Sequence, residues 1–311
     1  MRIGLDVGGT KIAGIARADD GTVLAHVRRA TGSGGDAVLT GILDAAGELR
    51  AQLADPDLRS IGIGIPGLVD AEAGLVVHAV NLGVESLAIA EHVQRMLGVP
   101  CFVENDVKAA ALGAAALRDD GAPIAYLNLG TGVAAGIIVD GRIWRGARGT
   151  AGEVGHFVVD PNGRLCGCGQ RGCIETLCGG GALARAWGGA GELPVKDILD
   201  AADAGDDVAI ALRDDLFRGA AAAVRALVLS VDVEVIVIGG GLTALTGRLE
   251  PGIHAALRAD AAQSSFLRSL RLDERIEMLP ADSPVAAVGA ALLGSVPAKT
   301  IALDKEIIVH G

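Results

Sequence analysis

The fold is decided by the stretch RIGLDVGGTKIAGIA, residues 2–16, together with a second stretch that has the same layout. In the first, an apolar strand ends beside a polar residue, a glycine turn follows, and a second apolar strand leaves the turn. The second stretch, YLNLGTGVAAGIIVDGRIW, spans residues 126–144. We predict that the chain contains an internal duplication in which each half opens with a β-hairpin.

The two copies align when the chain is shifted by 122 residues, the separation of Leu5 and Leu127. The same shift pairs Asp6 with Asn128, Gly8 with Gly130, and Ala13, Gly14 and Ile15 with Ala135, Gly136 and Ile137. The shared order of strand, glycine turn, strand and Asp-Gly turn favours duplication over a chance match in a chain with 46 glycines.

Strands and helices alternate between and after the two hairpins, which predicts an α/β fold with a largely parallel core. Apolar runs predict strands at 60–65, 101–103 and 233–238, and helical periodicity predicts helices at 37–54, 86–97, 106–117, 198–204, 208–229, 251–262 and 284–293. We expect one of these helices to begin at Pro251, because proline is favoured in the first turn. A strand-like run at 307–310 has no predicted neighbour.

The composition excludes several classes of protein. Of the 311 residues, 50% are apolar and 2% are aromatic, so the chain can bury a sizeable aliphatic core. A net charge of −11 argues against a nucleic-acid or anionic-membrane partner. No signal peptide or membrane-spanning run is evident, so we expect a cytoplasmic protein. In that compartment we do not expect the five cysteines to form disulfides.

Three glycine clusters follow apolar strands, and together they favour a nucleotide site. The turns at 8–10 and 130–132 expose backbone N–H groups, and two such turns facing each other could hold a polyphosphate from both sides. The carboxylate of Asp6 suits binding of a Mg²⁺-phosphate group. The third cluster, 239–241, would let an adenine or ribose approach the backbone closely. Taken singly, each cluster is also typical of an ordinary hairpin or helix-entry turn.

A polar motif, Glu104-Asn105-Asp106, stands between a predicted strand and a predicted helix. A carboxylate fixed at such a junction can accept the proton of a hydroxyl that attacks a γ-phosphate. The alternative is a helix cap, since Asn and Asp are favoured there. Asn105 and Asp106 could divide the two roles between them.

The segment 152–175 has a metal-binding pattern and two additional carboxylates, Glu153 and Glu175. The predicted metal ligands are His156, Cys166, Cys168 and Cys173. Three thiolates and an imidazole are a closed tetrahedral zinc set, and the interspersed glycines let the backbone turn tightly. A closed set leaves no open coordination position, so we expect a structural zinc; loop cysteines or disulfides are the alternative.

In the order of these motifs the chain resembles the ROK family of bacterial sugar kinases and repressors, which has a duplicated actin/hexokinase-like (ribonuclease H-like) α/β fold. The matching motifs are Asp6-Val-Gly-Gly-Thr-Lys11, Ile65-Pro-Gly-Leu-Val-Asp70, Glu104-Asn-Asp106, Leu129-Gly-Thr-Gly132, Gly152-Glu-Val-Gly-His156, Cys166 to Glu175 and Ile238-Gly-Gly-Gly241. The resemblance implies two lobes that close over a cleft: a small lobe of residues 1–117 plus 285–311, and a large lobe of residues 118–284.

The resemblance also implies roles for individual residues, with Asp106 as the general base. Sugar hydroxyls would be bound by Gly67, Asn81, Asn105, Asp106, Glu153, His156 and Glu175. The nucleotide and Mg²⁺ would be bound by Asp6, Gly8, Gly9, Thr10, Lys11, Gly130, Thr131, Gly132, Gly239, Gly240 and Gly241. His156 would serve twice, with one ring nitrogen on zinc and the other directed at the sugar.

The function implied is ATP-dependent phosphorylation of a hexose 6-hydroxyl, of glucokinase type, with ATP, Mg²⁺ and structural Zn²⁺, in a homo-oligomer that is a dimer or tetramer. The alternative substrates are amino or N-acetyl hexoses such as N-acetylmannosamine, N-acetylglucosamine or kanosamine. A sugar-sensing repressor would need an N-terminal DNA-binding domain, and we expect none before the motif at Asp6. A third hypothesis is a non-catalytic binding module stabilised by zinc, but it would not explain the glycine turns and Asp106.

The chain departs from the family pattern at four places. Lys108 stands where Asn is frequent, Ala114 where Glu is frequent, Ala134 where glycine is usual, and Gly83-Val-Glu85 where Pro-Gly-Trp often follows Asn81. Because three of these positions lie on the expected sugar side, the identity of the hexose stays open.

Overall fold

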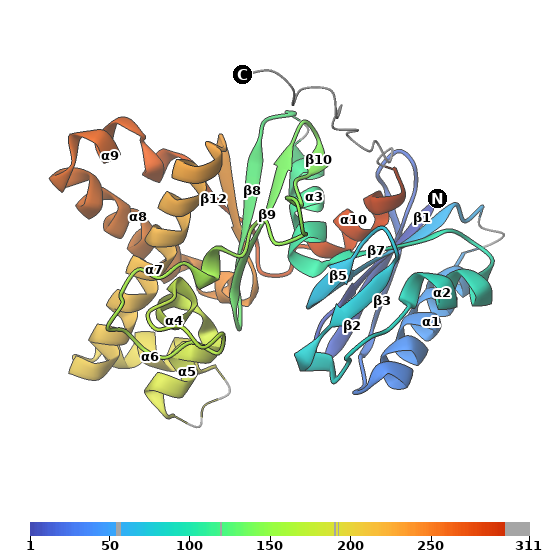
Figure 1. The fold of residues 1–311 in the computed structure, drawn as a ribbon, viewed down its shortest axis with the longest axis horizontal. Coiled ribbons are helices and arrows are strands. Elements are labelled where there is room, and N and C mark those ends of the chain that lie inside the picture. The colour runs from blue at the N-terminus through green and yellow to red at the C-terminus, as the bar shows by residue number, and fades with distance from the viewer. Residues whose placement is uncertain (54–56, 119, 190, 192, 296–311) are drawn as a thin grey trace, which may run out of the picture.

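Two five-stranded sheets form the framework of the computed structural model, which describes residues 1–53, 57–118, 120–189, 191 and 193–295. The strand orders are β3-β2-β1-β4-β7 and β10-β9-β8-β11-β12. In each sheet the first two neighbouring pairs are antiparallel and the last two are parallel. The identical order and direction confirm the predicted duplication, and the two sheets occupy opposite halves of the molecule (Figure 1).

The first sheet is built from the N-terminal third of the chain. Its strands are β1 (Arg2–Val7), β2 (Lys11–Arg17), β3 (Val23–Ala30), β4 (Ser60–Ile65) and β7 (Cys101–Asn105). Helices α1 (Gly35–Ala51) and α2 (Ile89–Leu97) bury their apolar residues against one face of this sheet. The hairpin β5 (Leu68–Asp70) and β6 (Leu75–His78) and the 3₁₀ turn η1 (Val80–Leu82) lie between β4 and α2 in the chain.

The second sheet is covered on one face by the larger helical layer. Its strands are β8 (Ile124–Leu129), β9 (Val133–Val139), β10 (Arg142–Ile143), β11 (Val235–Gly239) and β12 (Ile276–Met278). The helical elements of this half are η2 (Val154–His156), α4 (Ile174–Cys178), α5 (Gly180–Trp187), α6 (Pro194–Asp203), α7 (Asp207–Val231), η3 (Gly241–Leu245), α8 (Thr246–Gln263), α9 (Ser265–Ser269) and η4 (Leu272–Glu274).

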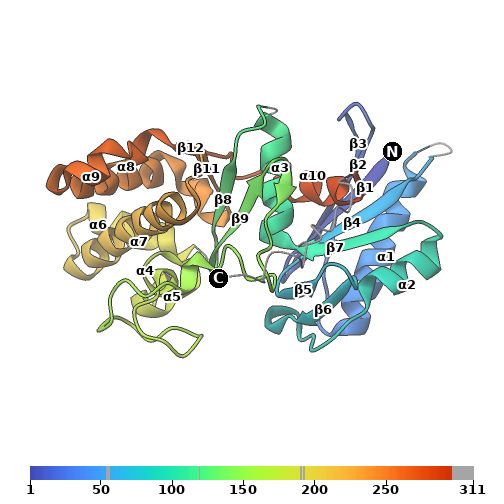
Figure 2. The same cartoon turned by 45° about the horizontal axis from the view of Figure 1, so that its top comes forward.

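Helices α3 (Asp106–Arg118) and α10 (Val285–Leu292) lie between the two sheets (Figures 1 and 2). Glycines make this close packing possible, since a Cβ on Gly113 would lie 2.0 Å from the Val285 carbonyl oxygen and one on Gly289 1.7 Å from that of Ala109. A Cβ on Gly136 of β9 would lie 2.7 Å from the Val107 carbonyl oxygen. The N-terminus of α3, where Asp106 lies, is therefore held against the second sheet.

The structure corrects the alignment of the two hairpins after their glycine turns. Val7 pairs with Ile12, whereas Leu129 pairs with Val133, so the second turn is one residue shorter than the first. The predicted equivalence of Ala13, Gly14 and Ile15 with Ala135, Gly136 and Ile137 is consequently wrong by one position. A shift of one residue places a side chain on the opposite face of the sheet. Gly14 accordingly faces Leu49 of α1, whereas Gly136 faces α3.

One predicted helix begins earlier than expected, and one strand-like run lies outside the described residues. The helix expected to begin at Pro251 is α8, which begins at Thr246, so the proline lies inside it. The chain already turns in η3 and continues directly into α8, and buried Leu249 fixes the first turn before the proline is reached. The run 307–310 belongs to the tail 296–311, which lies outside the described residues. Among the helices that the structure describes, none combines the length and apolarity needed to cross a bilayer.

Candidate active site

The first glycine turn connects β1 to β2 and is closed by backbone hydrogen bonds. The N–H of Gly8 donates to the carbonyl oxygen of Lys11 at 2.8 Å, and the hydroxyl of Thr31 donates to that of Gly8 at 2.7 Å. Gly9, Thr10 and Lys11 are exposed, as a turn that meets a phosphate requires. Asp6 lies one residue before the end of β1 and points into the same region.

The second glycine turn is packed against a glycine run that sequence reasoning missed. The N–H of Gly180 donates to the carbonyl oxygen of Gly130 at 2.8 Å, and that of Gly181 donates to Thr131 at 2.9 Å. The start of α5 thus supports the turn from behind. The signal that could have revealed this support is the run of three glycines at 179–181, which has no role in the expected zinc site.

The third glycine cluster closes over Tyr126, the single tyrosine of the chain. Gly239 ends β11, and a Cβ on it would lie 2.4 Å from the phenol oxygen of Tyr126. Gly240 has a φ of +93°, which favours glycine. Burial first, and then the charges of Asp6 and Asp106, raise the pKa of Tyr126, so the third cluster and both aspartates share one region.

The predicted base lies where the sequence placed it, at the junction of β7 and α3. Asp106 is the first residue of α3, and its Oδ1 accepts a hydrogen bond of 2.9 Å from the N–H of Val107. The side chain of Asn105 caps the helix, since its Oδ1 accepts from the N–H groups of Val107 at 3.1 Å and Lys108 at 3.2 Å. Asn105 therefore has the capping role, the Asp106 carboxylate lies beside it, and the role of Asp106 as the base stays a prediction.

Asn105 also reaches the loop after β4. Its Nδ2 donates to the carbonyl oxygen of Gly67 at 3.2 Å. Gly67 has a φ of +103°, and a Cβ there would lie 2.1 Å from the His78 carbonyl oxygen, so only glycine fits. Asn81, in η1, lies near the first turn, because a Cβ on Gly9 would be 3.9 Å from Cβ of Asn81.

Three carboxylates share the region between the sheets. Burial first, and then the charge of Asp106, raise the pKa of Asp6 to about 6, although Lys11 opposes the rise. Burial also raises the pKa of Asp106, and the charge of Glu153 adds to that rise. A carboxyl with a raised pKa and a directed lone pair is suited to accept a proton near neutral pH. Mutual repulsion of this kind also fits a site that receives a cation.

The four predicted metal ligands come together. One donor atom from each of His156, Cys166, Cys168 and Cys173 lies within 4.8 Å of all the others. The Sγ atoms of Cys168 and Cys173 are 3.7 Å apart, and Nδ1 of His156 is 3.7 Å from Sγ of Cys166. Tetrahedral ligands about 2.3 Å from a zinc ion are about 3.8 Å from one another, so the cluster has the dimensions that zinc requires.

The cluster also has the chemistry that a metal requires. Hydrogen bonds from Gln170, from its backbone first, lower the pKa of Cys168 to about 6, and the thiolate is the form that binds zinc. Nδ1 of His156 is directed at Cys166, so it is the ring nitrogen that would bind the metal. Glu175 follows Cys173 in α4, and its Oε2 accepts a hydrogen bond of 3.0 Å from the N–H of Val133.

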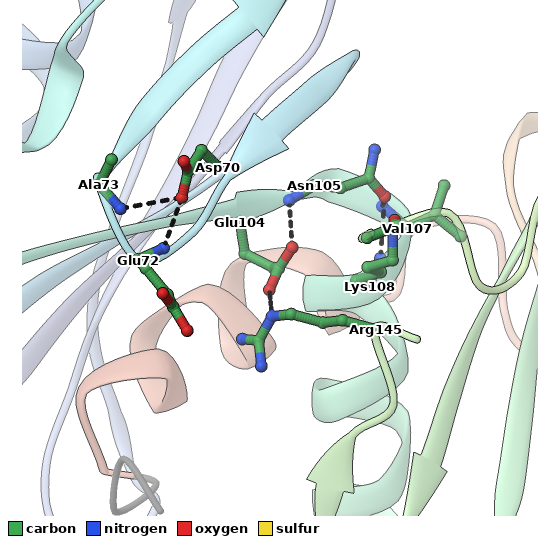
Figure 3. Close-up of polar contacts among 9 residues, drawn as sticks. Asp70, Glu72, Ala73, Glu104, Asn105, Val107, Lys108 and Arg145 are labelled. Carbon is green, nitrogen blue, oxygen red and sulfur yellow. Dashed lines mark hydrogen bonds and ion pairs between the residues drawn. The ribbon is translucent and has the colours of Figure 1, made fainter. Parts of the chain in front are cut away.

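Two contacts beside the candidate base were not foreseen from the sequence. Oε2 of Glu104, on β7, pairs with Nε of Arg145 at 2.6 Å, and Nζ of Lys108 donates to the carbonyl oxygen of Gly149 at 2.6 Å. Figure 3 shows the side chain of Arg145 directed at the Glu104 carboxylate, next to the turn formed by Asn105 and Lys108. The signal in the sequence was Lys108 at a position where Asn is frequent, and only the structure shows that this lysine is buried.

Comparison with known proteins gives consistent matches. The model of the ROK family matches residues 2–293 of this chain. A glucokinase from Halalkalibacterium halodurans is 32% identical over 264 residues, which cover 78% of this chain and 80% of the relative. An N-acetylmannosamine kinase from Yersinia pseudotuberculosis is 32% identical over 259 residues, which cover 81% of this chain and 87% of the relative.

A solved structure extends the match to the fold. The crystal structure of a ROK family glucokinase from Streptomyces griseus in complex with glucose and AMPPNP has a TM-score of 0.76 and 30% identity to this chain. The match covers 94% of this chain and 98% of that one. The expected actin/hexokinase-like fold is thereby confirmed.

Proposed function

The chain belongs to the ROK family and is an ATP-dependent sugar kinase, and we propose that it phosphorylates the 6-hydroxyl of a hexose, with glucose as the substrate. The proposal rests on the position of Asp106 at the start of α3. There its carboxylate lies among Asn105, which is tied to Gly67, and Glu153, whose charge reaches it. A base surrounded by such hydrogen-bonding groups suits an attacking sugar hydroxyl.

In the proposed reaction the Asp106 carboxylate accepts the proton of the 6-hydroxyl as that oxygen forms a bond to the γ-phosphorus. The bond from the γ-phosphorus to the bridging oxygen breaks, and ADP leaves with that electron pair. The raised pKa of Asp106 makes the carboxylate a better proton acceptor than an ordinary exposed aspartate. Asn105, Glu153 and His156 would orient the sugar by hydrogen bonds to its other hydroxyls.

The glycine turns would bind the nucleotide. We assign the phosphates to 8–11 and 130–132 and the adenosine to 239–241, on the support of the exposed turns and of the positive φ at Gly240. Asp6 would hold Mg²⁺, which when bound neutralises charge on the phosphate oxygens. The four-ligand cluster would hold a structural zinc that fixes the segment between His156 and Glu175.

The lobe division predicted from the sequence also enters the proposal. We propose that residues 1–117 with the C-terminal helix close against residues 118–284 when the hexose binds. Closure would exclude water, which otherwise competes for the γ-phosphate. Separate apolar cores under the two sheets support two lobes, whereas α3 and α10 pack between the sheets and span the boundary.

The test is an ADP-release assay over a panel of hexoses with the wild type and Asp106→Asn. We expect glucose-dependent ADP release in the wild type and a loss of about 10²- to 10⁴-fold in kcat in the variant. Asp36→Asn is the matched control, because Asp36 also lies in the first turn of a helix but is exposed on α1. If no hexose gives turnover that depends on Asp106, the proposed reaction is wrong.

An N-acetylated hexose is the second candidate substrate. Two observations favour it: the identity to an N-acetylmannosamine kinase equals that to a glucokinase, at 32%, and Gly83-Val-Glu85 follows Asn81 where glucokinases often have Pro-Gly-Trp. The same panel decides between them, because kcat/KM for glucose and for N-acetylmannosamine would be measured on one preparation. A higher value for N-acetylmannosamine would replace glucose in the proposal.

A further inference from the structure

The two unforeseen contacts join the segment that carries the base to the loop that leads to Glu153. On one side, Glu104 and Lys108 flank Asn105 and Asp106 in the sequence. On the other side, their partners belong to the loop 145–152, which follows β10 of the second sheet and ends immediately before Glu153. The contacts therefore connect a strand of the first sheet and the first turn of α3 to a loop of the second sheet (Figure 3).

Each contact contains one buried charged group, whereas the Arg145 side chain is 46% exposed. The Glu104 side chain is 3% exposed, and Lys108 is 6% exposed. A buried charge is costly unless it is paired or hydrogen-bonded, so each group depends on its partner. The other oxygen of Glu104 accepts a hydrogen bond of 2.9 Å from the N–H of Asn105. Both oxygens of the carboxylate are therefore hydrogen-bonded within the protein. Such groups hold one geometry instead of exchanging partners with water.

The loop 145–152 is itself tightly closed. The N–H of Ala151 donates to the carbonyl oxygen of Arg145 at 3.2 Å, so the two ends of the loop meet. The carbonyl oxygen of Gly152 accepts from the N–H of Ala135 on β9 at 2.7 Å, and a Cβ on Gly152 would lie 1.9 Å from the Ala135 carbonyl oxygen. The end of the loop next to Glu153 is therefore fixed to β9, and the contacts of Arg145 and Gly149 hold the rest of the loop against β7 and the start of α3.

From this placement we propose that Lys108 is a positioning residue that fixes the loop 145–152 against the start of α3. With the Glu104–Arg145 pair, it sets the separation of the Asp106 carboxylate from Glu153. The inference rests on the proposed function, since these two carboxylates are the ones assigned to the base and to sugar binding. Lys108 acts through the loop, because its ammonium is hydrogen-bonded to the Gly149 carbonyl oxygen.

Lys108 has a second effect that a purely structural residue would lack. Its positive charge lowers the pKa of Asp106, against the larger effect of burial and against Glu153. Ionisable groups from the surrounding elements also face this region: Asp6 from β1, Tyr126 from β8, and the Glu104–Arg145 pair. Loss of the ammonium therefore weakens the positioning of the sugar loop and also makes the base harder to deprotonate.

The experiment compares Lys108→Met with Lys108→Arg in the full chain, with the hexose and ATP as substrates. For Lys108→Met we expect the hexose KM to rise about tenfold or more, the equivalent of one lost hydrogen bond to a charged group, and the ATP KM to change less than about twofold. The acid limb of the kcat/KM profile for the hexose should move to higher pH. Lys108→Arg keeps a charge and donors, so it should recover part of both effects.

A second variant and a binding measurement separate the possible failures. Arg145→Met loosens the same loop and keeps the ammonium of Lys108 beside Asp106, so it should raise the hexose KM. Trp144, which is 46% exposed and precedes Arg145, is the only tryptophan in a Trp187→Phe background, and we expect its fluorescence to change when the hexose binds. Weakened hexose binding by Lys108→Met in that background would support the inference independently of turnover.

The outcomes are distinguishable. A wild type that neither binds nor phosphorylates any hexose contradicts the proposed function. An active wild type whose Lys108→Met variant keeps both its hexose KM and its acid limb overturns the role of Lys108 alone. If Lys108→Met does not fold, an unchanged hexose KM in Arg145→Met overturns the positioning role of the loop.

Discussion

The Glu175 carboxylate accepts a hydrogen bond of 3.0 Å from the backbone N–H of Val133, the residue that follows the second glycine turn. Its other oxygen, Oε1, is 4.0 Å from Sγ of Cys166. Glu175 thus connects the metal-ligand cluster to the turn assigned to phosphate. A change at the metal-ligand cluster should therefore alter the second glycine turn, and a change at the turn should alter the cluster.

Gly132→Ala tests that connection directly. A Cβ on Gly132 would lie 2.7 Å from Oε2 of Glu175, so the carboxylate must move and its hydrogen bond to Val133 is lost. We expect kcat/KM for the hexose to fall about tenfold or more, the equivalent of one lost charged hydrogen bond. Gly247→Ala is the control, since a Cβ there meets no atom within 4 Å. Equal kinetics for the two variants would contradict the prediction.

Zinc removal should weaken sugar binding more than nucleotide binding. We expect elemental analysis to give about one zinc per chain. Cys168→Ser should lose the metal and raise the hexose KM, because His156 and Glu175 belong to the segment that the metal would hold. Cys101→Ala removes a thiol outside the cluster and should keep its zinc. Unchanged hexose affinity in a zinc-free protein would separate the metal from the sugar site.

Asp6→Asn should stabilise the free protein and inactivate it. The folded-state pKa of Asp6, about 6, lies above its ordinary value of 3.8, so the charged form is disfavoured by folding. The cost is absent below about pH 4, grows as the pH rises to about 6, and is almost fully present at pH 7, where the substitution should gain about 3 kcal/mol. Urea unfolding at pH 7 and at pH 4 measures the gain and its disappearance.

The same variant should lose turnover, because an amide cannot replace the carboxylate assigned to Mg²⁺. A stabilised variant with full activity would show that Asp6 holds no metal during the reaction. A variant with no gain in stability at pH 7 would contradict the electrostatic cost deduced from burial and from Asp106.

Gly289→Ala should destabilise the packing of α10 on α3. A Cβ there would lie 1.7 Å from the Ala109 carbonyl oxygen and 2.7 Å from the Gly113 nitrogen, both of which belong to the backbone. Overpacking of this kind costs about 1–3 kcal/mol. The matched control is Gly47→Ala in α1, where a Cβ meets no atom within 4 Å and should gain up to about 1 kcal/mol from helix propensity. Thermal or denaturant unfolding compares the two, and opposite signs are expected.

Local signals in the sequence were sufficient for the elements and for much of the site. The hairpins at 2–16 and 126–144 were predictable because alternating apolar runs and glycine turns act over a few residues. Asp106 could be located at a strand–helix junction for the same reason. The four metal ligands were predictable because three of them lie within eight residues of one another.

Other features were not accessible in this way. The one-residue difference between the two glycine turns depends on strand register, which the repeated Ala-Gly-Ile sequence obscured. The start of α8 before Pro251 was set by η3 and by the burial of Leu249, which are properties of the packed chain.

By itself, the sequence determined the duplicated strand order, the junction that carries Asp106 and the set of metal ligands, because each depends on residues close together in the chain. Tertiary structure decided how these parts meet. Glu104 and Arg145, and likewise Lys108 and Gly149, are 41 residues apart in the chain. They come together only because Gly136 lets α3 pack directly on the second sheet. Burial then fixes both contacts, because the buried charges of Glu104 and Lys108 would be left unpaired and without water if either lost its partner.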